Sequence, residues 1–209
     1  MPAQQQALLV SGYSMKTILT LTFFLIFTSC SLSQLPPITY PIPQKDSFSF
    51  INRMPDKPIF VMIFSTESYW WSNTDNYRLI SYNGSTWTIW NYFRRWKSSS
   101  QRYSKTWPKN KKYFIPLGEI DGRVVAELFD SLGRLNFWEL NEDSLSETKG
   151  EIISDDVDYI FKFETQIGKK ILSSYAPEYY LNIFPDMNQR KYFLAAYRYF
   201  ESWWKKNSR

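Results

Sequence analysis

The chain contains no histidine, and Cys30 is its only cysteine. The first absence excludes Ser–His–Asp triads, Cys–His dyads and metal sites with histidine ligands. The second excludes an intramolecular disulfide. Glycine is also scarce, with 7 residues among 209, whereas 44% of the chain is hydrophobic and 19% is aromatic. This composition is typical of a globular protein, and nothing in it predicts a cofactor or a metal site.

The net charge of +5 is unevenly distributed along the chain. Residues 76–112 carry nine Lys or Arg and no acid, whereas residues 119–164 carry thirteen Asp or Glu and four bases. A moderate net charge therefore conceals a dipolar molecule, and each of the two segments is a candidate interaction surface.

Residues 15–30 have the layout of an export signal. Lys16 supplies a positive start, residues 18–27 are almost entirely apolar, and the small residues Thr28 and Ser29 offer a cleavage point. An apolar run of about ten residues is too short to span a bilayer, which needs roughly 20. The layout favours Met15 over Met1 as the translation start, and it predicts that residues 1–29 are a signal peptide.

Because Cys30 directly follows the small pair, the segment resembles the signal of bacterial lipoproteins, although Phe27 stands where that family prefers leucine. The resemblance implies cleavage before Cys30 and a diacylglycerol on its thiol, so that the protein is anchored to a membrane of the cell envelope. Ser31 stands where an aspartate would mark inner-membrane retention, and the resemblance therefore favours the outer membrane. It covers only the signal and implies nothing about the rest of the chain.

The remainder divides into a tether and a domain. Residues 30–58 hold six prolines, and proline favours extended chain without backbone donors, so we predict a Pro-rich tether. Residues 59–209 are long enough for a single domain with a real core.

Two hairpins are predicted within the domain, after a buried strand at residues 59–64. The first spans residues 77–95 around a two-residue Asn83-Gly84 turn, which would pair Ile80 with Trp87. The second spans residues 158–175, with Gly168 in a left-handed conformation.

The helical elements are predicted from caps and periodicity. Asp121 begins a central helix that Gly133 ends, residues 135–140 form a strand, and residues 141–156 form an acidic loop. Asp186 and Gln189 form a capping box for the C-terminal helix. The apolar stripe of that helix comprises Phe193, Ala196, Tyr197, Phe200, Trp203 and Trp204.

A favourable i,i+4 pair, Glu201 with Lys205, completes the C-terminal helix. The elements together predict an α+β fold. It is a single domain with antiparallel β-hairpins, one central helix and a C-terminal amphipathic helix packed on the sheet.

Basic and aromatic side chains alternate after the first hairpin, and we predict a binding surface that includes Arg94, Arg95, Trp96, Lys97, Arg102 and Trp107. In a cell envelope such a surface suits anionic headgroups or an acidic partner. Nucleic acid also fits this pattern but does not fit an exported protein. The alternative is a solvated loop that balances the acidic residues 119–164.

Aromatic residues in the predicted loop after residue 64 form a second candidate surface, which comprises Tyr69, Trp70 and Trp71. Together with Trp203 and Trp204 they are candidates for stacking on a glycan, and burial in the core is the alternative.

Catalysis without histidine would need paired carboxylates, and Glu119, Glu127, Glu139 and Glu164 are the candidates for glycan hydrolysis. Chance alone brings some carboxylates together in so acidic a region. The sequence therefore favours a non-catalytic, lipid-anchored envelope domain that binds a protein or glycan partner. A glycan hydrolase and a structural subunit of an envelope complex are the alternatives.

Overall fold

The structure is a computed structural model in which residues Pro36–Arg209 form one compact unit. It describes residues 35–40, 42–43, 49–67, 74–95, 114–154 and 156–208, and of residues 42–43, 74–75 and 94–95 it describes the backbone alone.

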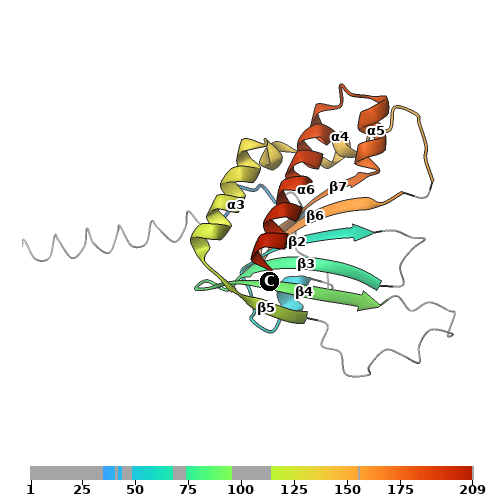
Figure 1. Ribbon diagram of the computed structural model, residues 1–209. Coiled ribbons are helices and arrows are strands. Elements are labelled where there is room, and N and C mark those ends of the chain that lie inside the picture. The colour runs from blue at the N-terminus through green and yellow to red at the C-terminus, as the bar shows by residue number, and fades with distance from the viewer. Residues whose placement is uncertain are drawn as a thin grey trace, which may run out of the picture. The chain divides into compact units, whose positions relative to one another are not determined.

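A seven-stranded antiparallel sheet forms the centre of the domain (Figure 1), in the order β1-β7-β6-β2-β3-β4-β5. Its strands are β1 (Ile42–Pro43), β2 (Phe60–Glu67), β3 (Thr74–Tyr82), β4 (Trp87–Arg95), β5 (Phe114–Ile120), β6 (Asp158–Thr165) and β7 (Gly168–Tyr175). The helices are α2 (Phe50–Arg53), α3 (Gly122–Arg134), the 3-10 helix η2 (Phe137–Glu139), α4 (Glu142–Ser146), α5 (Pro177–Ile183) and α6 (Asn188–Asn207). The predicted α+β fold is confirmed, with the C-terminal helix packed on the sheet.

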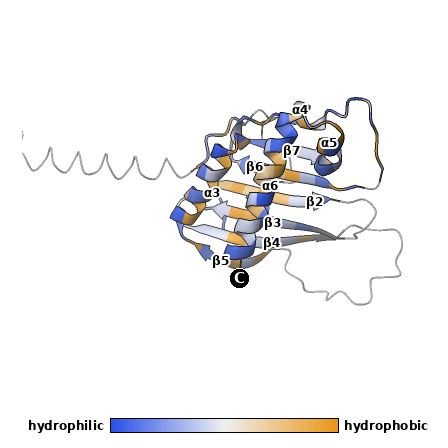
Figure 2. Ribbon diagram, turned by 45° about the horizontal axis from the view of Figure 1, so that its top comes forward, coloured by the Kyte–Doolittle hydropathy of each residue, from blue (hydrophilic) through white to orange (hydrophobic). Residues whose placement is uncertain are grey.

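One face of the sheet, called the helix face below, is covered by α3 and α6 (Figure 1). Strand side chains alternate between the two faces, and the helix face receives the aromatic residues of β6. Phe161 and Phe163 are fully buried, and the Phe161 ring centroid lies 5.6 Å from that of Phe200 on α6. Figure 2 shows hydrophobic residues on the strands and hydrophilic residues on the outer sides of the helices. The predicted apolar stripe is therefore the surface that attaches α6 to the sheet.

The opposite face has a smaller core closed by α2. Phe50, Ile51 and Met54 pack there against residues that include Ile63 and Leu79. These three residues belong to the segment 30–58 that the sequence assigns to the tether. Residues 49–54 are thus part of the folded domain.

A buried carboxylate holds α2 in place. Glu164 of β6 is fully buried, and its Oε2 accepts hydrogen bonds from the Ser49 hydroxyl and the Phe50 amide, both at 2.8 Å. Its Oε1 forms an ion pair with Lys162. Glu164 therefore satisfies amides at the start of a helix that has no side-chain cap of its own.

A second buried charge joins α6 to the chain around it. Arg190 is 1% exposed, and it donates to the carbonyl oxygens of Tyr175 (3.1 Å) and Glu147 (2.6 Å). Its guanidinium carbon lies 4.3 Å from the Tyr180 ring centroid. Burial lowers the pKa of Arg190 from its usual value.

The predicted register of the first hairpin is wrong. Ile80 pairs with Ile89, and Tyr82 pairs with Trp87, so the loop has four residues in place of two. The Asn83 side chain accounts for the longer loop, because its Oδ1 accepts from the amides of Ser85 (3.0 Å) and Thr86 (2.9 Å). Such a turn is stabilised by the asparagine side chain rather than by a ladder pair.

The predicted strand at residues 135–140 is also wrong. Asn136 adopts a left-handed conformation (φ 56°), and η2 follows it. The apolar residues of this segment enter the core without forming a strand: Phe137 and Leu140 are buried, and the Phe137 ring centroid lies 4.9 Å from that of Phe161. Gly133 lies inside α3 and does not end it, and the predicted acidic loop contains α4.

Three local interactions of the chain differ from those predicted. Asp186 forms an ion pair with Lys149 at 3.1 Å instead of capping α6, whose first turn has no side-chain cap. Glu201 pairs with Arg78 of β3 rather than with Lys205. Gly168 does not have a positive φ, because the turn before it is held by the Thr165 hydroxyl.

Candidate functional site

The two ends of the sheet differ in what connects to them. β1 pairs with Gly168 and Lys169, close to the start of β2 at Phe60 and the end of β6 at Thr165. We call this the entry end, because the chain joins the sheet there. The opposite end, the distal end, carries the last residue of β2, Glu67, and its partner Asp158. Eight residues of strand separate the two ends by about 25 Å.

The predicted binding segments connect to strands at the distal end. Residues 68–73 join the end of β2 to the start of β3, and residues 96–113 join the end of β4 to the start of β5. Thr74 pairs with Arg95, so the first connection ends, and the second begins, on neighbouring strands. Tyr69, Trp70, Trp71, Trp96, Lys97, Arg102, Trp107 and Cys30 lie outside the described residues, and so do the side chains of Arg94 and Arg95.

Among the elements that the structure describes, the helices leave part of the helix face of the sheet uncovered near its distal end. β2, β3 and β4 extend beyond α6 there (Figure 1). Six side chains with some exposure occupy this surface, which we call the distal shelf: Thr66, Asn76, Arg78, Asn91, Phe93 and Tyr159. Their shared face follows from the register, since Tyr159 pairs with Thr66, Asn76 with Phe93, and Arg78 with Asn91.

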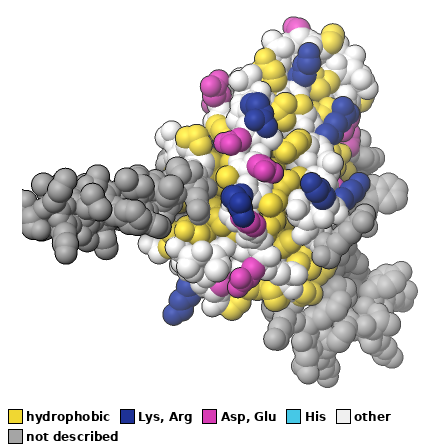
Figure 3. All heavy atoms as spheres, turned by 60° about the vertical axis from the view of Figure 1, so that its left-hand side comes forward, with side chains coloured by type: hydrophobic (Ala, Val, Ile, Leu, Met, Phe, Trp, Pro, Cys, Tyr) yellow, Lys and Arg dark blue, Asp and Glu magenta, His cyan; other side chains and the backbone are white. Residues whose placement is uncertain are grey.

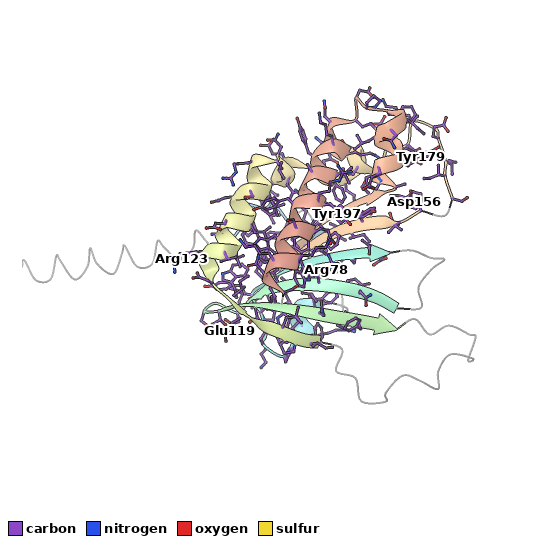
Figure 4. All side chains as sticks on the ribbon, in the orientation of Figure 1. Arg78, Glu119, Arg123, Asp156, Tyr179 and Tyr197 are labelled. Atoms are coloured by element: carbon purple, nitrogen blue, oxygen red, sulfur yellow. The ribbon has the colours of Figure 1, made fainter. Side chains whose placement is uncertain are left out.

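The shelf is bordered by side chains of α6. Tyr197 stacks on Phe64 with ring centroids 5.4 Å apart, and it meets the Tyr159 ring edge-on at 4.6 Å. Arg78 forms an ion pair with Glu201, and its guanidinium carbon lies 5.7 Å from the centroid of the Phe64 ring. Figure 4 shows Arg78 and Tyr197 together at the seam between β3 and α6. These contacts fix the positions of the bordering side chains.

The polar side chains of the shelf are mostly unpaired. Among the residues that the structure describes, the side chains of Thr66, Asn76 and Asn91 make no hydrogen bond. The hydroxyls of Tyr159 and Tyr197 likewise have no partner among them. Amide and hydroxyl groups that both donate and accept are therefore available to a ligand.

The pKa values of both tyrosines in the shelf region, Tyr159 and Tyr197, are raised above the usual value. Burial, followed by the nearby Glu178 carboxylate, raises the pKa of Tyr159 to about 12. Burial also raises the pKa of Tyr197, with Glu201 as the next contributor. At neutral pH both phenols are protonated and can donate hydrogen bonds.

Tyr159 should make the fold sensitive to alkali. Its pKa is near 10 in the unfolded chain and about 12 in the fold, so its contribution to stability is complete below pH 10 and is lost as the pH rises toward 12. Two pKa units correspond to about 2.7 kcal/mol, which solvent screening reduces to roughly 1 for a partly exposed group. At pH 11, midway between the two pKa values, half of this contribution is lost, so urea denaturation at pH 8 and pH 11 should show about 0.5 kcal/mol less loss for Tyr159→Phe than for the wild type. An equal loss in both proteins would contradict this.

The four candidate carboxylates for hydrolysis do not share one environment. Glu119, Glu127 and Glu139 are exposed on β5, α3 and η2, whereas Glu164 is buried and bound to α2. No group of three acidic or cysteine side chains in the described parts of the chain could hold a metal ion. None of the four predicted carboxylates is therefore one of the residues of the distal shelf.

The C-terminal tryptophans belong to the core. Trp203 and Trp204 are 7% and 6% exposed, and each packs against Phe200. Of the two interpretations of these tryptophans, stacking on a glycan or burial in the core, the structure shows burial.

Figure 3 shows acidic and basic side chains interspersed with hydrophobic ones on the face it presents. The separation of charge along the sequence does not make that face acidic or basic.

No known protein family, curated protein or solved structure matches the chain. Within the described ranges, no helix has the length and apolar character needed to cross a bilayer.

Proposed function

We propose that this protein is a lipid-anchored domain of the bacterial cell envelope, in the outer membrane, that binds a glycan or protein partner on its distal shelf. The lipoprotein-like signal ending at Cys30 supports the anchor. The shelf supports the binding role, because it combines aromatic rings with unpaired amide and hydroxyl groups.

One observation carries the proposal. The shelf lies at the end of the sheet opposite the entry of the chain, and thus about 25 Å from the point where a tether would join the domain. Residues 69–71 and 94–107, predicted from sequence to bind, connect to strands at the same end.

A binding role is favoured over hydrolysis. Two carboxylates at the border are held by arginines: Glu201 by Arg78, and Glu178 by Arg198 at 4.0 Å. A retaining or inverting hydrolase needs one carboxyl group that carries a proton. A structural role would call for an apolar patch on α6, whose large aromatic residues Phe193, Phe200, Trp203 and Trp204 are buried.

The anchor is tested by intact-mass analysis of membrane-extracted protein, wild type beside Cys30→Ser. We expect the wild type to begin at Cys30 and to carry a diacylglyceryl group, and the variant to lack it. An unmodified wild-type chain would overturn the anchor.

The binding role is tested by cosedimentation of the full chain, in detergent, with isolated envelope fractions. The double variant Asn76→Ala, Asn91→Ala should lose at least about tenfold in affinity, since one well-placed hydrogen bond contributes about 1 kcal/mol. Asn188→Ala, at an exposed asparagine that begins α6, is the matched control. Equal binding by both variants would contradict a role of the shelf, and release of soluble sugar would indicate the hydrolase instead.

A further inference from the structure

The shelf has an aromatic residue at each side and polar residues between. Its outermost row of side chains lies on four successive strands. Tyr159 on β6 pairs with Thr66 on β2, and Asn76 on β3 pairs with Phe93 on β4, whereas the pairing of β2 with β3 ends one residue earlier, at Ser65 and Tyr77. Paired strands lie about 4.8 Å apart, so three strand spacings separate the two aromatic residues by at least about 14 Å. A single sugar ring cannot reach both of them, whereas an extended oligosaccharide can.

Among the described residues, the charged side chains beside this row have partners. Arg78 is paired with Glu201, and Arg198 lies 4.0 Å from Glu178. The Asp156 carboxylate accepts a hydrogen bond from the Val157 amide at 2.7 Å. The row itself consists of a phenol, a hydroxyl, an amide and a phenyl ring, and the Tyr159 phenol stays neutral because its pKa is raised. A strongly charged ligand would find no unpaired counter-charge among these side chains, whereas the hydroxyl groups of an uncharged sugar would find donors and acceptors.

The polar groups of the row also favour a glycan over an extended peptide. A peptide that adds to a sheet pairs with the backbone of an edge strand, but β2, β3, β4 and β6 are interior strands whose backbones are already paired on both sides. A ligand on the shelf can therefore interact only with the side chains above the sheet. Aromatic faces beside hydrogen-bonding side chains match a sugar ring, which has apolar C–H faces and polar edges.

We infer that the distal shelf binds an extended, uncharged oligosaccharide of about three sugars that lies across the strands, with one end on Tyr159 and the other on Phe93. This inference rests on the proposed function and specifies its ligand. Asn76 and Thr66 hydrogen-bond the central sugar, and the Tyr159 hydroxyl donates to the first.

The test measures binding of the detergent-solubilised full chain to uncharged oligosaccharides by calorimetry. The probes are β-1,4-linked N-acetylglucosamine, glucose and mannose and α-1,4-linked glucose, each from one to six units, with oligogalacturonates as the acidic series. For at least one uncharged series, we expect affinity to rise up to about three units and then to level off. The acidic series should bind at least about tenfold more weakly.

Variants locate the ligand. Tyr159→Ala and Phe93→Ala should each weaken trisaccharide binding about tenfold, in line with the loss of one aromatic contact. Tyr159→Phe should keep most of the affinity because it keeps the ring. Tyr199→Ala removes a tyrosine that is 36% exposed on the outer side of α6 and should have no effect. Melting curves confirm that each variant is folded.

Binding that is independent of chain length, or stronger for the acidic series, would overturn the inference. So would the absence of binding to every uncharged series. If envelope fractions still bind in a manner that depends on Asn76 and Asn91, the proposed function stands and the ligand is a different partner, such as a protein. If neither envelope fractions nor oligosaccharides depend on the shelf, both proposals fail.

Discussion

Replacing Phe161 by alanine should lower the free energy of unfolding by about 4 kcal/mol. Phe161 is fully buried, and four rings surround it: those of Phe64 (4.8 Å between centroids), Phe137 (4.9 Å), Phe200 (5.6 Å) and Phe193 (5.7 Å). These rings come from β2, η2 and α6, so the truncation leaves a cavity where three elements meet. Rigid aromatic neighbours cannot collapse into that cavity without disturbing each other.

Urea denaturation followed by tryptophan fluorescence measures this loss. Phe161→Leu should cost much less, because leucine keeps most of the buried apolar volume. Ile167→Ala, at a residue that is 81% exposed in the β6–β7 turn, is the control and should change stability by less than about 0.5 kcal/mol. A loss below about 2 kcal/mol in Phe161→Ala would mean that this core can repack.

Replacing Glu164 by alanine should cost about 3 kcal/mol. The substitution removes the carboxylate that forms an ion pair with Lys162, whose side chain is 19% exposed. It also removes the acceptor for the Phe50 amide and the Ser49 hydroxyl. Removing one partner of a buried ion pair costs roughly 3–5 kcal/mol, and the partial exposure of Lys162 places this case at the lower limit.

Hydrogen exchange gives this prediction a local readout. In Glu164→Ala the amides of Phe50 and Ile51 should lose protection more than those of β6 itself, because α2 is released before the sheet opens. Glu127→Ala, at an exposed glutamate on α3, is the matched control. Uniform loss of protection across the domain would show that α2 is not held separately by this carboxylate.

The elements with local patterns were predictable from the sequence. The alternation of Tyr159, Phe161 and Phe163 predicts β6 and its buried face, and the stripe from Phe193 to Trp204 predicts α6. Both follow from geometric repeats within one element. Errors arose where a side chain made an unforeseen local bond, as at Asn83, or where apolar residues entered the core without a strand, as at Phe137.

The shelf and the two buried charges could not be predicted because their partners are distant in sequence. Glu164 binds Ser49, and Arg190 binds the carbonyl oxygen of Glu147. The shelf depends on the pairing of β2 with β6, which places Tyr159 beside Thr66. A charged residue in an alternating strand reads as solvent-exposed in a sequence, and only the docking of another segment reveals that it is buried.

The pairing of β2 with β6 also governs how the domain folds. The sheet consists of two halves, β1-β7-β6 and β2-β3-β4-β5, and the hairpins within them join neighbouring segments of the chain. The two halves meet only where Phe60–Glu67 pairs with Asp158–Thr165, and that contact closes a loop of about a hundred residues. Such closure is entropically costly and slow compared with hairpin formation. Until this seam closes, the inner edges of β2 and β6 are unpaired strands rich in phenylalanine, and they are the edges through which two newly made chains would exchange halves.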